Sequence, residues 1–143
     1  MSALAPLPAD APHLPRLPSV PNLPKPISRP LHGVVTDYPY VALVSTAPET
    51  AGFADEKTAA TLCRVMARTI LVSSLLTRAE WGVFKTMPYK THLFLDRVGG
   101  LTARSAPWLF GFAGNERARN TFLAMGVFGG IAGTMSDTAE MPV

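Results

Sequence analysis

The stretch Ser105–Phe122, "SAPWLFGFAGNERARNTF", decides how the C-terminal part of the chain folds. An apolar, aromatic run ends at Gly114-Asn115, a small charged cluster follows, and a second apolar run begins. Glycine suits the end of one helix, and Asn115 is a favourable N-cap for the next. The pattern therefore predicts a hairpin of two helices, over residues 91–112 and 116–135.

The second helix of this hairpin has a composition typical of lipid. It carries no charged residue between Asn120 and Ser136, whereas a membrane span needs about 20 apolar residues. A glycine costs a helix in water about 1 kcal/mol relative to alanine, but in a bilayer it lets helix backbones approach closely. Two overlapping G-x-x-x-G pairs give this helix a glycine face, which we expect to dock against other subunits of a membrane complex: Gly126, Gly129, Gly130 and Gly133.

The first helix of the hairpin is less apolar. Asp96, Arg97 and Arg104 interrupt it, and Pro107 is expected to kink or break it. Within a bilayer, Arg104 would need an internal partner or a position facing water. A compact soluble helical domain is therefore the alternative to a membrane hairpin.

Two further helices are predicted upstream. Residues 55–76 have apolar side chains at helical spacing, with two acids in the first turn, where the helix dipole favours them. Thr77 and Glu80 match a capping box, which predicts a short helix from Arg78 to about Met87. Its aromatic and basic side chains are typical of a membrane interface.

The first 50 residues differ in composition, because they hold eleven of the fourteen prolines. At three residues per turn, a polyproline II helix over residues 12–24 would carry a proline stripe beside an aliphatic stripe. We expect an extended strap over residues 1–50 that clasps a partner, with a stiff solvated spacer as the alternative. The expected strap contacts are Leu14, Pro15, Leu17, Pro18, Val20, Pro21, Leu23 and Pro24. Residues 32–46 are rich in β-branched and aromatic side chains and predict one or two short strands.

Charge and cysteine content exclude several classes of function. The net charge of +3 is spread along the chain without a run of basic residues, which argues against nucleic-acid binding and fits anionic lipid headgroups. The single cysteine, Cys63, excludes an intrachain disulfide and a multi-cysteine metal site. We expect it to be a buried or inert thiol. The N-terminus lacks the pattern of a cleaved signal peptide.

The sequence does not predict an active site. Its three histidines, His13, His32 and His92, are far apart along the chain. His92 and Asp96 are four residues apart, so Asp96 could orient the ring, and His92 is a candidate ligand for a haem or pigment. No paired carboxylates, phosphate-binding loop or serine elbow appear in the sequence. We therefore expect no enzyme activity, no metal and no cofactor.

The stretch Ala106–Gly133, "APWLFGFAGNERARNTFLAMGVFGGIAG", resembles the SPW-repeat family of small bacterial membrane proteins. That family has a Ser-Pro-Trp-like triplet closing one hydrophobic helix, an "LFGF" run, a short polar turn and a second hydrophobic helix. The matching residues are Pro107, Trp108, Phe110, Phe112 and Asn115. The resemblance covers about residues 91–136 and implies a hairpin in the bacterial inner (cytoplasmic) membrane, with no catalytic residue to carry over.

The sequence thus predicts an all-α membrane protein. A helical, membrane-associated domain over residues 51–143 contains the hairpin 91–136 and preceding amphipathic helices. We expect a non-catalytic accessory or assembly subunit of a larger membrane complex, with a photosynthetic or respiratory assembly as a reasonable host. Its partners would be other subunits and the lipid bilayer, with no nucleic acid. The alternatives are a pigment- or haem-binding membrane subunit and a soluble helical adaptor with a proline-rich ligand segment.

Overall fold

A computed structural model describes residues 24–143, so the predicted strap contacts from Leu14 to Leu23 lie outside the described residues. The described chain is helical, with two isolated bridges as its only extended pairing, and an all-α fold is confirmed. The elements are α1 (Arg29–Leu31), the π-helical turn η1 (His32–Asp37), α2 (Tyr38–Thr50), α3 (Lys57–Leu76), α4 (Tyr89–Leu109) and α5 (Glu116–Met135).

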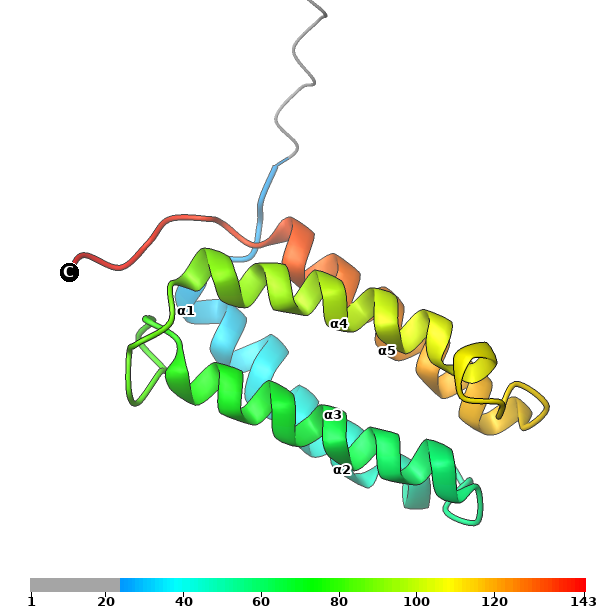
Figure 1. The fold of residues 1–143 in the computed structure, drawn as a ribbon. Coiled ribbons are helices and arrows are strands. Elements are labelled where there is room, and N and C mark those ends of the chain that lie inside the picture. The colour runs from blue at the N-terminus through cyan, green and yellow to red at the C-terminus, as the bar shows by residue number, and fades with distance from the viewer. Residues whose placement is uncertain (1–23) are drawn as a thin grey trace, which may run out of the picture.

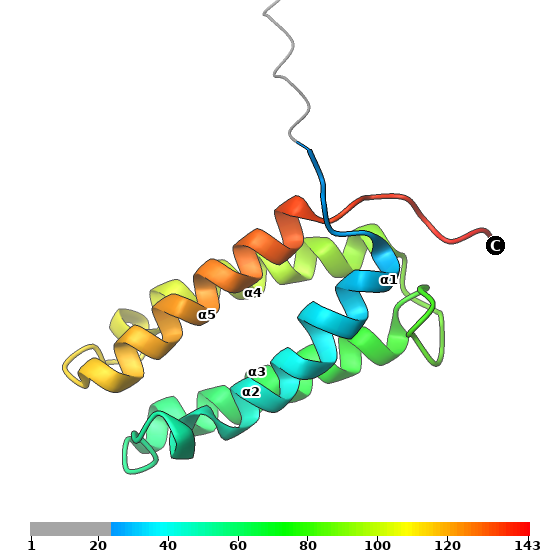
Figure 2. The ribbon, with the colours of Figure 1, turned by 180° about the vertical axis from the view of Figure 1, so that it is seen from behind.

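The long helices form two hairpins, α2 with α3 and α4 with α5, that lie side by side (Figures 1 and 2). Both hairpin tips lie at one end of the molecule. The connection between α3 and α4 lies at the other end, together with α1 and the C-terminal tail. This arrangement brings the beginning of the first hairpin next to the beginning of the second.

The second hairpin repeats the sequence pattern of the first. Gly52 and Gly111 follow the first helix of their hairpins and both have positive φ, 74° and 77°, a conformation that glycine adopts at little cost. The residue after each glycine is a buried phenylalanine. Identical residues 59 positions apart include Asp37/Asp96, Ala47/Ala106, Pro48/Pro107, Gly52/Gly111, Phe53/Phe112, Ala59/Ala118 and Met66/Met125. The chain is therefore a tandem of two related helical hairpins.

The predicted strands over residues 32–46 are wrong, because this segment is helical in η1 and α2. Tertiary packing outweighs the strand propensity of this segment, because the helix buries Val44 and Ala47 in the core shared with α3. Pro39 lies in the first turn of α2, where the helix needs no N–H donor. Residues 29–50 are therefore helical and do not belong to an extended strap.

The predicted helix from Arg78 to Met87 is also wrong, since these residues form an irregular connection. The two side chains of the expected capping box are engaged elsewhere. The Thr77 hydroxyl donates to the Ser73 carbonyl, 2.6 Å away, and Glu80 forms an ion pair with Arg29 at 2.7 Å. A local motif therefore gives way to contacts with distant parts of the chain.

The C-terminal hairpin is confirmed. Asn115 caps α5 by accepting a hydrogen bond from the Ala118 N–H at 3.1 Å. Pro107 is buried in the last turn of α4, where it does not interrupt the helix. The buried Phe112 ring packs on Phe122. Trp108 and Phe110, the other aromatic residues of the motif, are exposed.

Three of the four α5 glycines pack against α4 of the same chain, rather than being free to dock against another subunit. A β-carbon at Gly126 would overlap the Arg104 side chain and lie 2.7 Å from the Gly100 carbonyl oxygen. A β-carbon would lie 3.2 Å from the α4 backbone at Gly129 and 2.8 Å from it at Gly133, whereas a β-carbon at Gly130 meets no atom within 4 Å. Three of the four glycines therefore close the hairpin itself.

Replacing Gly126 with alanine should lower the free energy of unfolding by about 1–3 kcal/mol, because the methyl group overpacks the contact with α4. Gly130→Ala is the matched control on the same helix and should raise it by up to about 1 kcal/mol through helix propensity alone. Thermal unfolding followed by far-UV circular dichroism measures both changes. Equal effects of the two substitutions would contradict the proposed packing.

Candidate metal centre

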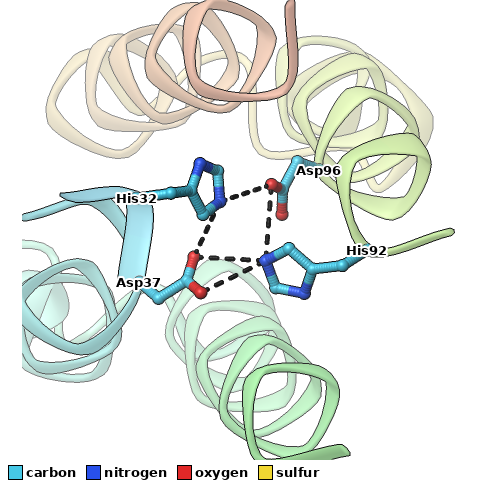
Figure 3. A group of neighbouring side chains, drawn as sticks. All are labelled: His32, Asp37, His92 and Asp96. Atoms are coloured by element: carbon cyan, nitrogen blue, oxygen red, sulfur yellow. Dashed lines mark hydrogen bonds and ion pairs between the residues drawn. The ribbon is translucent and has the colours of Figure 1, made fainter. Parts of the chain in front are cut away.

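Four side chains converge between the two hairpins: His32, Asp37, His92 and Asp96 (Figure 3). One nitrogen or oxygen of each lies within 4.8 Å of the corresponding atom of every other. Both histidine side chains have no exposed surface, Asp37 is 3% exposed and Asp96 is 13% exposed. Titratable groups buried this deeply must be balanced by one another or by a bound cation.

Each hairpin contributes one histidine and one aspartate from its first helical segment. His92 and Asp96 are four residues apart on α4, which places them on one face of an α-helix. His32 and Asp37 are five residues apart, but they lie in the π-helical turn η1, whose hydrogen bonds span five residues. The spacing between histidine and aspartate is one residue longer in the first hairpin than in the second. Because η1 is π-helical, His32 and Asp37 still face the same side, toward the centre.

The distances between these groups match those of ligands around a small metal ion. His32 Nε2 lies 3.2 Å from Asp37 Oδ1 and 3.1 Å from Asp96 Oδ2. His92 Nε2 lies 3.2 Å from Asp37 Oδ2 and 3.6 Å from Asp96 Oδ2. Around a tetrahedral ion with bonds of about 2.0–2.1 Å, neighbouring ligand atoms are about 3.3 Å apart. The four histidine–aspartate separations, 3.1–3.6 Å, are therefore close to those around a shared ion, and all four ligand atoms lie within 4.8 Å of one another.

Hydroxyl groups fix the tautomer of both histidines. His32 Nδ1 lies 2.7 Å from Ser136 Oγ, and His92 Nδ1 lies 3.0 Å from Thr77 Oγ1. Each hydroxyl donates its own proton to the carbonyl four residues earlier on its helix, at 2.6 Å in both cases. A hydroxyl has one proton, so it must accept from the ring, and Nδ1 carries the hydrogen. In the neutral ring, Nε2 then carries no hydrogen and can only accept a hydrogen bond or bind a cation.

These bare nitrogens face carboxylate oxygens. His32 Nε2, Asp37 Oδ2 and Asp96 Oδ2 are buried and have no hydrogen-bond partner within residues 24–143. His32 Nε2 nevertheless lies 3.1 Å from Asp96 Oδ2, and Asp37 Oδ2 lies 3.2 Å from His92 Nε2. Two acceptors held at such a distance in the interior repel unless a cation lies between them. The cation is either a proton on the imidazole or a metal ion bound by all four groups.

The pKa values of His32 and Asp37 also indicate that a cation lies between the imidazoles and the carboxylates. Burial alone would lower the pKa of His32, but the adjacent Asp37 and Asp96 carboxylates outweigh it and raise this pKa to about 9. Burial would likewise raise the pKa of Asp37, yet the two imidazoles hold it below its ordinary value. His32 thus keeps a proton beside the two carboxylates at neutral pH, and a metal ion would compete with that proton for the imidazole nitrogen.

Aromatic rings close the centre on one side. The Trp81 ring lies 5.3 Å from the His92 ring, and the Tyr89 ring lies 5.7 Å from the His32 ring, between centroids. Trp81 is fixed by donating from its indole N–H to the Arg29 carbonyl at 2.9 Å. These rings limit the access of water to the imidazoles and lower the local dielectric.

The sequence pattern predicts one pair of these residues, His92 and Asp96, but no metal site. The predicted proximity of His92 and Asp96 is confirmed, with 3.6 Å between Nε2 and Oδ2. No local pattern in the sequence pairs His32 or Asp37 with another residue. A whole helical hairpin separates these two residues from His92 and Asp96 along the chain. The tandem pattern was the missed signal, since the two aspartates are 59 positions apart and the two histidines 60.

The glycines and motif aromatics predicted as site residues lie away from the four ligand side chains, apart from Gly129, whose position faces the Asp96 backbone. Cys63 is buried in the hydrophobic core, as predicted. No family model matches the chain, and neither does any curated protein or solved structure.

Proposed function

We propose that this chain is a divalent-metal-binding protein in which one ion, held by His32, Asp37, His92 and Asp96, joins the two helical hairpins. One observation carries the proposal: two imidazole nitrogens that must be bare in neutral rings converge with two carboxylates in a buried site. A metal ion satisfies all four groups at once, whereas hydrogen bonds among them leave three buried atoms without partners.

The ligand set favours zinc. Two imidazole nitrogens and two carboxylate oxygens are donors that Zn²⁺ accepts in tetrahedral geometry, while Ca²⁺ and Mg²⁺ prefer oxygen ligands throughout. Manganese and ferrous ions accept the same donors, with lower intrinsic affinity. Two carboxylates also cancel the charge of one divalent ion, so the loaded centre is neutral. Neutrality matters because the site is buried.

The ion would act as a clamp between the hairpins. It would add to the contacts that already join the hairpins, a shared hydrophobic core that includes Ala67 and Ala103 and the hydrogen bond from the Tyr40 hydroxyl to the Met125 carbonyl at 3.0 Å. Ligands from both hairpins would be linked through the ion. Because the unfolded chain does not present this arrangement, metal binding would stabilise the fold.

A second proposal concerns location: the protein is a membrane-associated accessory subunit. Among the described helices, α3 is long and apolar enough to cross a membrane. The α4 cation Arg97 donates to the Gly133 carbonyl of α5 at 2.7 Å, although Arg97 and Arg104 both remain exposed. Exposed large apolar residues on α3, α4 and α5 include Val65, Val72, Phe94, Val98, Leu101, Leu109, Val127 and Ile131. Such a surface suits lipid or the other subunits of a complex.

Zinc should bind to the purified protein with one ion per chain. At about 100 times its dissociation constant it should stabilise the fold by about 2.7 kcal/mol. Asp37→Asn and His92→Gln should each remove this stabilisation, while Asp55→Asn, at the exposed tip of the first hairpin, should keep it. Metal analysis and thermal unfolding with and without zinc are the measurements. Full zinc stabilisation in both ligand variants would rule the centre out.

The hydroxyls behind the histidines should tune metal affinity. Thr77→Val and Ser136→Ala each leave one Nδ1–H without its acceptor, and we expect a loss of about 10- to 100-fold in zinc affinity for each. Thr50→Val is the control, because Thr50 makes the same hydrogen bond to the fourth preceding carbonyl, at 3.0 Å, far from the centre. Competition against a chelating dye measures the affinities. Wild-type affinity in both variants would refute the assigned tautomers.

The membrane proposal predicts that the protein stays in the membrane pellet after alkaline carbonate extraction, because lipid contact through an apolar surface does not depend on charge. A peripheral protein of the same cells, released by the same treatment, serves as the control. Recovery of the full chain in the soluble fraction would contradict membrane association and leave the metal proposal standing.

A further inference from the structure

A cavity of about 250 Å³ adjoins the metal centre between α3 and α4, with η1, α2 and α5 completing its wall. Asp37 and Asp96 lie at its polar end. Most of the remaining lining is apolar and includes Met66, Ile70 and Phe128. Ligand sites in proteins have this composition, a largely apolar wall with a few polar groups that fix orientation.

The hydroxyl groups in the wall are already occupied. The Tyr40 hydroxyl donates to the Met125 carbonyl across the hairpins. The other hydroxyls each donate to a carbonyl of their own helical segment, and they belong to Thr36, Thr69, Ser73 and Thr102. These hydroxyls have no proton left to donate, and among the acceptors in the wall the two carboxylates are the charged ones, which form the stronger hydrogen bonds.

Asp96 is the carboxylate that reaches the cavity. Its side chain is 13% exposed, against 3% for Asp37 and none for the two histidines. One of its oxygens contacts His32 and His92, and Figure 3 shows the other without any contact to the cluster. That oxygen can accept a hydrogen bond from a molecule in the cavity while its partner oxygen faces the centre.

We propose that the cavity binds a small, neutral, largely apolar molecule, a phenol with a short alkyl chain in size and chemistry, whose hydroxyl donates to Asp96. The proposal rests on the proposed function only in assigning the charge of the centre. A cavity of about 150 Å³ accommodates benzene, so this one has room for a ring with a short substituent. Tyr40 and Phe128, whose rings stack 4.5 Å apart, offer an aromatic wall.

The occupant is neutral because the carboxylates are already balanced. A divalent metal ion cancels their charge, so an additional cation would be buried without a counter-charge. A phenolic hydroxyl adds a hydrogen bond without adding charge. A hydrogen bond to a charged acceptor is also stronger than one between neutral groups.

The test compares 4-propylphenol with propylbenzene, which has the same apolar body and no hydroxyl. Isothermal titration of the zinc-loaded full chain should give about 10- to 100-fold tighter binding for the phenol, the range for a hydrogen bond to a charged group. Equal affinities would overturn the role of Asp96. Tighter binding of protonated 4-propylbenzylamine would overturn the neutral class of ligand.

Gly99→Val tests the location. Gly99 lines the cavity, and a β-carbon there meets no atom within 4 Å, so valine fills the space without disturbing the fold. Gly130 has equally open surroundings but does not line the cavity, which makes Gly130→Val the matched control. Binding of 4-propylphenol should fall at least 10-fold in Gly99→Val and remain unchanged in Gly130→Val. Unchanged binding in Gly99→Val would overturn the proposal.

Zinc affinity measured on the same variants separates the two proposals. Zinc binding without any phenol binding would defeat the cavity proposal alone. Phenol binding that prefers the hydroxyl, in a protein that binds no divalent metal, would defeat the metal proposal and support the cavity.

Discussion

The structure depends on the electrostatic balance of one buried cluster. Two imidazoles carry their hydrogen on Nδ1, because the hydroxyls of Ser136 and Thr77 have already donated their protons to helix carbonyls. Their Nε2 atoms therefore face carboxylates in a site that excludes water. Without a cation the contact is repulsive, and with one it joins the two halves of the molecule. The metal centre, the clamp and the neutral ligand cavity all follow from this constraint.

The two hairpins build the cluster reciprocally. Each histidine is held by the hydroxyl at the C-terminal end of the other hairpin, His32 by Ser136 and His92 by Thr77. Each isolated bridge likewise joins the end of one hairpin to the segment that precedes the other. Ser136 pairs with Ile27, and Thr77 pairs with Met87. Neither hairpin completes the site alone. The exchange of contacts resembles the self-complementary interface of a symmetric dimer, here within one chain.

Local signals in the sequence were reliable where nothing distant competed with them. The Asn115 cap and the glycine turn define the second hairpin, and both depend on neighbouring residues only. The capping box at Thr77 and Glu80 failed because each side chain found a stronger partner far along the chain. Val34 and Val35, which suggested a strand, lie exposed on the helical turn η1, and the residue of this segment that reaches the core is Val44 on α2.

The sequence by itself determined the helical hairpin near the C-terminus, the close packing of its glycines and the pairing of His92 with Asp96, because helical spacing sets all three. Only the tertiary structure decided that these glycines meet α4 and that His32 and Asp37 join the other pair. Both outcomes depend on how two hairpins lie against each other. Spacing along one helix carries no information on that arrangement, because the contacts that define it join residues separated by an entire hairpin.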